Sequence, residues 1–596
     1  MKTILIYVFL WLSFATFAVD PYLGYLYPAG MKKGTKTQII IGGQALRGKM
    51  RPLITPDGIK ILSVTSVPNF PRATGTQSKY LLSYLKNITE GKNEAPPLPE
   101  EEKREGWRKN TWWEKMDTLD ELSLSILAKD LCVRKNVLQS TPSLQQLLIL
   151  ELEIAEDAKT GEYQIRMFGR NGVSNSKRFF VDNAEHFTEP LFTPPFVKEK
   201  PLPVIDVFPV VLDGQILPGE TDKFVFKLAA GQDYTFSLCG RELQPFIGDA
   251  VPGHFQAIMR IIDAAGVEKT FVDDEYHRAD PVLRFKPKND GNYTLEVRDN
   301  IFRGRDDFVY RVVVTAQIEP YMPRKSLIAI DEAARSLTEE EAQKQILTAK
   351  SVVDITGVIS PKGKIATFRL QAEKDDEIVL EVFARRFDSP LDSRLCLRKP
   401  DGTILTENDD GAFDLNIGTI AQNVDSYLKV KIPTAGIYTI ELSDRVNSGD
   451  ANYKYRLQIR PPSPDCKVYS AKSNINLSGN GTPILFFVER IDGFAGAVKL
   501  SCDDLDIVGS DEIAAAHKSG TIKFKQNWSR RSTPQGIEIF AEFNINGRVV
   551  KKTVIPADEV MQAFAYMHLV PASNFYAMEV WQKQNMKRQS LKTKTK

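Results

Sequence analysis

The sequence predicts an all-β protein built from tandem β-sandwich domains, with a short helical insertion in the first domain. Short runs that alternate apolar and polar residues, such as Lys223-Phe-Val-Phe-Lys-Leu and Tyr438-Thr-Ile-Glu-Leu, end at Gly, Pro, Asn or Asp. This pattern is typical of antiparallel strands that bury one face. One strand-rich region also recurs farther along the chain, which indicates a duplicated domain.

Length and charge set the class of protein. At about 100–200 residues per domain, 596 residues correspond to about three to five domains. The 78 Lys and Arg nearly balance the 76 Asp and Glu, which argues against a nucleic-acid-binding face. A hydrophobic content of 42% with 26% charged residues fits soluble globular domains rather than a disordered or multi-span membrane chain.

The first 18 residues have the layout of a secretory signal peptide. Lys2 gives a positive start, and an uncharged apolar stretch then ends at Thr16-Phe17-Ala18, with small residues at the expected cleavage site. We therefore expect a secreted protein, located in the periplasm, at the cell surface or outside the cell. No transmembrane span is expected in the mature chain.

The first domain is expected over residues 19–185. Within it, residues 97–146 carry dense mixed charge followed by leucines at near-helical spacing, which predicts a helical insertion. Trp107, Trp112 and Trp113 fall in this insertion; they either cover the sandwich or form an aromatic platform for sugar rings. Residues 186–205 are rich in proline and are expected to be a linker.

Segments 206–318 and 350–462 are expected to be copies of one sandwich. The matching residues are Gly214 with Gly357, Phe224 with Phe368, Asp280 with Asp425, Gly291 with Gly436, and Tyr310 with Tyr455. Their offset of about 144 residues is far longer than the roughly 20–50 residues of a solenoid repeat, so it indicates domain duplication. Between the copies, residues 319–349 are expected to be a linker with a short helix.

The last folded unit is expected over residues 463–581. Its strand-rich composition and length suit an Ig-like sandwich with a closing segment. Residues 582–596 are basic and are expected to be a disordered tail. The five cysteines are scattered; they are expected to be small buried residues, with Cys466–Cys502 as the one plausible disulfide.

Catalytic signatures are missing from the sequence. It contains no Gly-x-Ser-x-Gly elbow, His-Glu-x-x-His helix, Walker loop or Cys-x-x-Cys pair. The five histidines lie in separate segments without paired spacing. We therefore expect a protein that is not an enzyme and has no catalytic residues or organic cofactor.

Two acidic loops are candidates for binding calcium, because clustered Asp and Asn side chains supply the oxygen ligands that this ion prefers. The loops follow corresponding strands of the two copies. The expected ligands are Asp273, Asp274 and Glu275 in the first loop and Asn408, Asp409, Asp410 and Asp414 in the second. The alternative is a pair of solvated turns, since Asp and Asn stabilise turns through backbone hydrogen bonds.

The two copies resemble bacterial pre-peptidase C-terminal (PPC) domains, jelly-roll-like β-sandwich modules of secreted proteins. The resemblance rests on the stretches Gly214-Gln-Ile-Leu-Pro-Gly-Glu-Thr-Asp-Lys-Phe, Asp263-Ala-Ala-Gly and Gly291-Asn-Tyr-Thr-Leu-Glu-Val. The flanking units are similar to Ig/TIG-like domains in large secreted proteins of planctomycete-like bacteria. In some PPC relatives, acidic residues near the Gly-Asp-x-Asp turn bind calcium.

This chain departs from the PPC pattern at that turn. The two aspartates are replaced by Glu220 and Asp222 in the first copy and by Lys364 and Ala366 in the second. The Glu-Pro-Asn-Asp opening of the family is also expected to be missing from both copies. The resemblance therefore favours calcium in the first copy over the second.

Together these features predict a non-catalytic secreted protein that binds or scaffolds at the cell envelope or on an extracellular polymer. The expected partners are polysaccharide, protein polymer or other envelope proteins, and not nucleic acid. Two alternatives remain. One is a purely structural envelope protein; the other is an accessory or divergent member of a secreted hydrolase or peptidase system.

Overall fold

The structure is a computed structural model of the chain. It describes residues 20–67, 75–92, 120–132, 144, 146–189, 192, 201–241, 243–245, 253–321, 335–350, 352–411, 424–528, 532–562 and 566–580. The expected signal peptide, the three insertion tryptophans, Asp414 and the basic tail lie outside these residues. Among the described residues no helix is long and apolar enough to cross a membrane.

Domain 1 is a sandwich of two sheets with strand orders β1-β3-β6-β5 and β2-β9-β7-β4. Its strands are β1 (Tyr22–Tyr27), β2 (Gly30–Lys32), β3 (Lys36–Gln44), β4 (Arg51–Thr55), β5 (Ile59–Ser66), β6 (Gln146–Ile154), β7 (Gly161–Gly169), β8 (Gly172–Val173) and β9 (Lys177–Asp182). The core lies between the sheets and includes Ile39, Leu150 and Ile165, all fully buried. Alternation along the strands supplies these inward residues, as the sequence predicts.

The insertion of domain 1 is longer than expected and contains two described helices, α1 (Gly75–Thr89) and α2 (Glu121–Cys132). They pack on each other through Leu81, Leu85 and Leu127. The helix α2 falls within the predicted insertion, whereas α1 precedes it. The insertion thus separates β5 from β6, two strands that nonetheless pair in one sheet.

The two copies have the same strand order in both of their sheets. The strands of repeat 1 are β10 (Glu185–Thr188), β11 (Val204–Ile205), β12 (Val210–Gln215), β13 (Asp222–Leu228), β14 (Tyr234–Cys239), β15 (Ala257–Asp263), β16 (Glu268–Val272), β17 (Val282–Phe285), β18 (Gly291–Asp299) and β19 (Val309–Thr315). They form 5-stranded sheets ordered β10-β12-β19-β14-β17 and β11-β13-β18-β15-β16.

Repeat 2 follows the same order strand for strand, β20-β22-β29-β24-β27 and β21-β23-β28-β25-β26. Its elements are β20 (Arg335–Thr338), α3 (Glu339–Gln343), β21 (Ile346–Thr348), β22 (Val353–Val358), β23 (Ala366–Ala372), β24 (Glu377–Phe383), a 3-10 turn (Arg385–Phe387), β25 (Ser393–Arg398), β26 (Ile404–Asn408), β27 (Tyr427–Lys431), β28 (Gly436–Asp444) and β29 (Lys454–Arg460).

Both predicted linkers contain strands that belong to the repeats. Within 186–205, β10 and β11 pair in parallel with β12 and β13. Within 319–349, β20 and β21 pair in the same way with β22 and β23. Repeat 1 therefore begins at 185 instead of 206 and repeat 2 at 335 instead of 350. The composition does not reveal this, because such short parallel edge strands form only through tertiary pairing.

A glycine–tyrosine contact explains one pair of matched residues. Gly214 pairs with Tyr310 across the β12–β19 ladder, and Gly357 pairs with Tyr455 in repeat 2. A Cβ atom at Gly214 would come within 2.3 Å of the Tyr310 ring, and one at Gly357 within 2.4 Å of the Tyr455 hydroxyl. Glycine is therefore required where each buried ring crosses its neighbouring strand.

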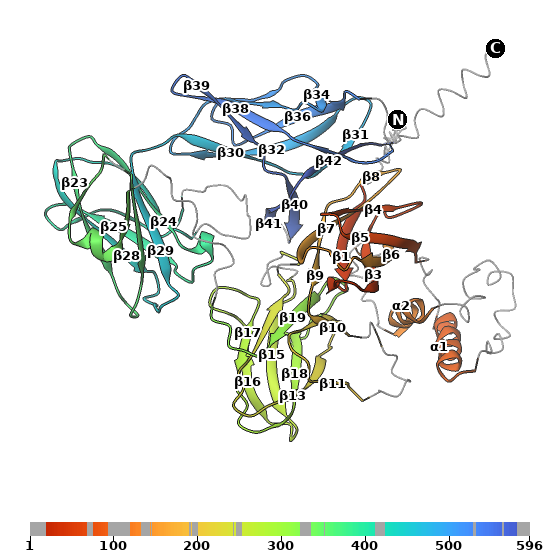
Figure 1. The fold of residues 1–596 in the computed structure, drawn as a ribbon. Coiled ribbons are helices and arrows are strands. Elements are labelled where there is room, and N and C mark those ends of the chain that lie inside the picture. Colours follow the sequence, from red (N-terminus) through yellow and green to blue (C-terminus); the bar gives the residue numbers. More distant parts are fainter. Residues whose placement is uncertain are drawn as a thin grey trace, which may run out of the picture.

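The last folded unit, here called domain 4 because the two repeats are the second and third domains, is a sandwich of several small sheets with a projecting hairpin (Figure 1). Its strands are β30 (Asp465–Ser470), β31 (Asn474–Leu477), β32 (Thr482–Ile491), β33 (Val498–Ser501), β34 (Leu505–Ile507), β35 (Glu512–Ile513), β36 (Ser519–Gln526), β37 (Gln535–Ile537), β38 (Phe540–Ile545), β39 (Arg548–Thr553), β40 (Ala557–Gln562), β41 (Tyr566–Pro571) and β42 (Phe575–Glu579). Cys466 and Cys502 are free thiols here, so they form no disulfide.

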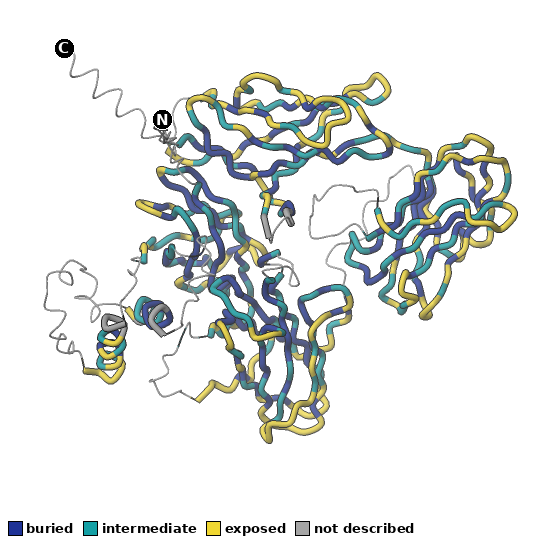
Figure 2. Tube along the Cα trace, turned by 180° about the vertical axis from the view of Figure 1, so that it is seen from behind, coloured by how far each residue is buried: buried dark blue, intermediate teal, exposed yellow. Residues whose placement is uncertain are grey.

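The four sandwiches are arranged as a ring, with repeat 1 and repeat 2 joined at one corner and domain 4 returning to domain 1 (Figure 1). Each sandwich keeps its own buried core, while turns and outer edges are exposed (Figure 2). The hairpin β40–β41 points from domain 4 into the ring. There, His568 lies with its Nε2 atom 3.0 Å from the carbonyl oxygen of Pro245 in repeat 1.

The corner between the repeats is an ion-pair junction. Arg278 of repeat 1 pairs with Asp388 of repeat 2, and its Nε atom lies 3.1 Å from Asp388 Oδ1. His277 Nε2 lies 3.1 Å from the same oxygen. Tyr276 donates a 2.9 Å hydrogen bond to Asp450. Three consecutive side chains thus fix one repeat on the other.

Asp492 of domain 4 joins repeat 2 to domain 4. Its carboxylate accepts hydrogen bonds of 2.7 Å from the Tyr427 hydroxyl and the Ser463 amide, and it pairs with Arg460. Opposing charge and three donors make this a well-satisfied buried carboxylate.

Domain 4 meets domain 1 around Arg166, a fully buried arginine of β7. Its guanidinium donates to Ser473 Oγ at 3.0 Å and to the Asn574 carbonyl at 3.2 Å, both in domain 4. Nearby, the Val173 amide donates to the Asn476 side chain at 2.8 Å. These contacts close the ring.

Candidate cation site between domain 1 and repeat 1

Three carboxylates of repeat 1 converge beside domain 1. Glu189 directly follows β10, Glu220 lies two residues before β13, and Asp222 is the first residue of β13. One oxygen from each lies within 4.8 Å of the others. They form the single group of three or more potential His, Cys, Asp or Glu metal ligands found within the described ranges. The parallel pairing of β10 with β12 brings Glu189 to this place.

The carboxylates are held by few hydrogen bonds. Asp222 is 1% exposed, and its Oδ2 atom accepts a 2.6 Å bond from the Tyr310 hydroxyl. Its Oδ1 atom is buried without a hydrogen-bond donor among the described residues. Glu220 accepts a 2.8 Å bond from the Leu217 amide. An oxygen atom of Asp222 is therefore left to be satisfied by a proton or a cation.

Burial and mutual repulsion make this cluster unfavourable when fully ionised. Desolvation, followed by the Glu220 charge, raises the pKa of Asp222 to about 8. Desolvation and the neighbouring Asp222 and Glu220 carboxylates hold the pKa of Glu189 well above its usual range. Since like charges in a poorly solvated site cannot all ionise, the cluster must take up protons or bind a positive ion.

Domain 1 covers this cluster directly. The Tyr27 hydroxyl, at the end of β1, donates a 2.7 Å hydrogen bond to the Glu189 carbonyl oxygen. Lys129 of α2 lies nearby, but its Nζ atom contacts Asp306 at 3.2 Å and Gln215 at 3.3 Å. The ammonium group thus has its contacts outside the cluster, although burial raises the pKa of Glu220 and the charge of Lys129 acts at longer range to lower it. A cation between these carboxylates would sit at the seam of two sandwiches.

The donor set fits a hard divalent cation. Ca²⁺ prefers carboxylate and carbonyl oxygens and tolerates irregular geometry, and the described ligands of the site are all carboxylates, with no nitrogen or sulfur donor for a softer metal among them. The unsatisfied oxygen of Asp222 and the raised pKa values are the features that a bound Ca²⁺ would relieve. Glu189, Glu220 and Asp222 would hold the ion and link β10 to β13.

The predicted calcium ligands lie elsewhere and do not form this site. In repeat 1, Glu275 is engaged by two arginines, Arg278 at 2.8 Å and Arg284 at 2.6 Å. Its carboxylate is therefore used in ion pairs, and no three of the predicted acids of this loop converge. Asp273 is exposed at the surface. Arginines therefore supply the counter-charge of Glu275, and calcium binding by this loop stays a prediction.

In repeat 2 the corresponding loop is a hydrogen-bonded turn where it is described. The Asn408 side chain donates to the carbonyl oxygens of Asp410 at 2.7 Å and Tyr427 at 2.9 Å. Asp409 pairs with Arg445 at 2.9 Å. These contacts match the alternative of a solvated turn; Asp414 lies outside the described residues.

Sequence reasoning identified Glu220 and Asp222 as altered family positions but missed Glu189. From the sequence we expect the family's Glu-Pro-Asn-Asp opening to be missing from this copy. Glu189 now occupies the position after the first strand of repeat 1, followed by Pro190. The signal that would have found it is this Glu-Pro pair, hidden in a segment that composition assigns to a linker.

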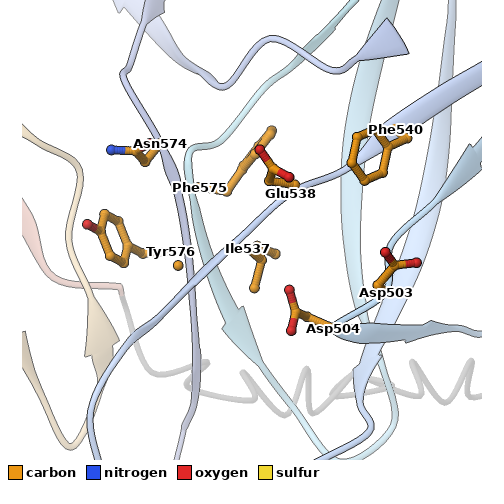
Figure 3. Close-up of a pocket in the computed structure, with 9 residues that line it drawn as sticks. Asp503, Asp504, Ile537, Glu538, Phe540, Asn574, Phe575 and Tyr576 are labelled. Carbon is orange, nitrogen blue, oxygen red and sulfur yellow. The ribbon is translucent and has the colours of Figure 1, made fainter. Parts of the chain in front are cut away.

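A second feature is a pocket of about 310 Å³ in domain 4 (Figure 3). Asp503 and Asp504 lie on one side of it and Asn574 and Tyr576 on the other, with Glu538 between strands β37 and β38. All three carboxylates are exposed to solvent. Because water solvates these carboxylates, they do not carry the desolvation cost of the cluster between domain 1 and repeat 1.

Comparisons with known proteins leave the family open. No family model matches the chain, and no curated protein matches it in sequence. Among solved structures, a β-glucuronidase of Faecalibacterium prausnitzii is 10% identical over 33% of this chain and 38% of that one, with a TM-score of 0.18. A β-glucuronidase of Ruminococcus gnavus is 11% identical, covering 33% of this chain and 36% of that one at a TM-score of 0.18.

A Lactobacillus rhamnosus β-glucuronidase is 12% identical over 33% of this chain and 36% of that one, with a TM-score of 0.17. This chain therefore spans little more than a third of the length of these enzymes. Likenesses at such TM-scores carry no argument about fold or activity.

Proposed function

We propose that this chain is a secreted, non-catalytic scaffold whose domain 1 and repeat 1 are locked together by a calcium ion. Its four sandwiches would form one platform at the cell envelope or on an extracellular polymer. Polysaccharide, a protein polymer or other envelope proteins would be its partners, and PPC-like repeats with flanking Ig-like domains its modules.

The observation that carries this proposal is the buried carboxylate cluster at a junction between sandwiches. Three acids lie close together at this junction, and Tyr27 of domain 1 contacts the same segment. A calcium ion would offset most of the local negative charge and make the junction favourable. Calcium is abundant outside cells, so such a lock suits a secreted protein.

Thermal unfolding of the mature chain with calcium or with chelator tests the lock. If the ion binds the folded state alone, calcium at about one hundred times its Kd adds about 2.7 kcal/mol of stability. Asp222→Asn should abolish this gain. Asp273→Asn, in the loop predicted from sequence, is the matched control and should keep it; equal melting in calcium and chelator would overturn the lock.

Co-sedimentation with insoluble polysaccharides, a collagen-like polymer and source-cell envelopes tests the scaffold role. We expect salt-resistant retention on one of these materials, lost when the chain is unfolded. Self-assembly without retention would instead support a purely structural envelope protein. Hydrolysis of a polymer by wild type, abolished by one Asp or His substitution, would overturn the non-catalytic assignment.

A further inference from the structure

The position that Glu189 occupies in repeat 1 is occupied by Glu339 in repeat 2. Thr188 pairs with Asp213 in the parallel β10–β12 ladder, and Thr338 pairs with Thr356 in the parallel β20–β22 ladder. Gly214 and Gly357 then follow at the same step of their strands. Each glutamate therefore comes one residue after its strand at the same register, although unequal linkers hide this match in the sequence.

Repeat 2 has no acidic residues at the two positions that correspond to Glu220 and Asp222 of repeat 1. The Lys364 amide donates to the Pro361 carbonyl at 3.1 Å, as the Glu220 amide donates to the Leu217 carbonyl at 3.0 Å. Lys364 thus occupies the place of Glu220. Two residues later, Ala366 begins β23 where Asp222 begins β13.

The Lys364 side chain fills the space that a cation would take. Its Nζ atom lies 2.6 Å from Glu339 Oε1 and donates a 2.8 Å hydrogen bond to the Val358 carbonyl oxygen. The Val358 amide lies 3.4 Å from Glu339 Oε2. Repeat 2 therefore balances one carboxylate with one ammonium, whereas repeat 1 gathers three carboxylates with no base in ion-pair contact among the described residues.

We propose that Lys364 is a built-in counter-ion that replaces, in repeat 2, the divalent cation bound by repeat 1. Calcium then acts on this chain at the junction of domain 1 and repeat 1 alone, and repeat 2 keeps its first strand attached at any calcium concentration. This inference rests on the proposed cation site. Physically, a tethered ammonium needs no free ion, because the chain itself supplies the positive charge.

Exchange of the residue pairs between the repeats tests this inference. The variant E220K/D222A carries the repeat 2 pair into repeat 1 and should lose calcium binding while melting, in chelator, above E220A/D222A. The two variants differ only in the side chain at position 220, so their difference isolates the effect of the lysine on Glu189. In isothermal titration with CaCl₂, wild type should bind one ion and E220K/D222A none.

The reverse exchange, K364E/A366D, should create a second site, so the calcium stoichiometry should rise from one to two per chain. K364A is its control: it removes the counter-ion without adding ligands and should keep a stoichiometry of one. The far-UV circular dichroism spectrum verifies that each variant is folded.

The outcomes separate the two proposals. No calcium binding by wild type overturns both the cation site and the role of Lys364. Wild-type binding that Asp222→Asn abolishes, together with equal melting of E220K/D222A and E220A/D222A in chelator, overturns the role of Lys364 alone. A stoichiometry of one for folded K364E/A366D has the same consequence.

Discussion

Replacing Arg166 by methionine should open the ring between domain 1 and domain 4. The guanidinium is 2% exposed and donates to three acceptors, the Ser174 carbonyl at 2.8 Å, Ser473 Oγ at 3.0 Å and the Asn574 carbonyl at 3.2 Å. Hydrogen bonds from a charged donor contribute about 1.5–3 kcal/mol each. Burial opposes them, since desolvation lowers the pKa of Arg166.

The net loss expected for Arg166→Met is therefore roughly 2–4 kcal/mol in the free energy of unfolding, less than the sum of three bonds. Urea denaturation measures this loss, and small-angle X-ray scattering should show a larger radius of gyration. Arg178→Met on the neighbouring strand β9 is the control, because its side chain is 42% exposed and pairs with Glu162 at the surface. Identical stability and scattering of the two variants would refute the reasoning.

Three further predictions concern the other junctions. Asp492→Asn should cost roughly 2 kcal/mol in urea denaturation, because it removes the carboxylate that joins Arg460 to domain 4 and leaves Arg460 paired with Glu381 of repeat 2 alone; an unchanged midpoint would count against that junction. Burial lowers the pKa of His277, which lies against Asp388 of repeat 2. Stability should therefore fall as the pH drops below about 6.5, because the imidazole of the unfolded chain takes up a proton more readily than the buried one. His277→Asn should reduce the difference in melting temperature between pH 5 and pH 7.5. An equally large difference in this variant would exclude His277 as its source. Tyr27→Phe, which removes the bond to the Glu189 carbonyl, should lower stability by about 1 kcal/mol in calcium; a melting temperature equal to that of wild type would show that this hydroxyl does not hold the junction.

The class of fold and the duplication follow from local sequence. Alternation in Lys223-Phe-Val-Phe-Lys-Leu sets an inward face that the structure uses, with Phe224 and Phe226 buried. The residues matched between the two copies make the same contacts in both. Asp280 and Asp425, for example, accept hydrogen bonds from the backbone amides of Arg241 and Arg385.

The candidate site could not be predicted in the same way, because its ligands meet only through tertiary pairing. A four-residue strand such as β10 has no distinctive pattern, and the prolines that follow it suggest a linker. The acidic loops show the converse limit of sequence reasoning. Glu275 lies in a dense acidic run, but its counter-charges come from Arg278 and Arg284, and a short acidic motif does not reveal which bases fold against it.

Hydrogen exchange of the mature chain, with and without calcium, tests the central claim most directly because it localises the effect. We predict that calcium slows amide exchange in β1, in β10 with Glu189, and in the turn before β13, and leaves the matching segment of repeat 2, 335–339, unchanged. Unaltered exchange at all these places would contradict the account. Protection confined to the loop at 272–276 would contradict it as well and restore the calcium site predicted from sequence.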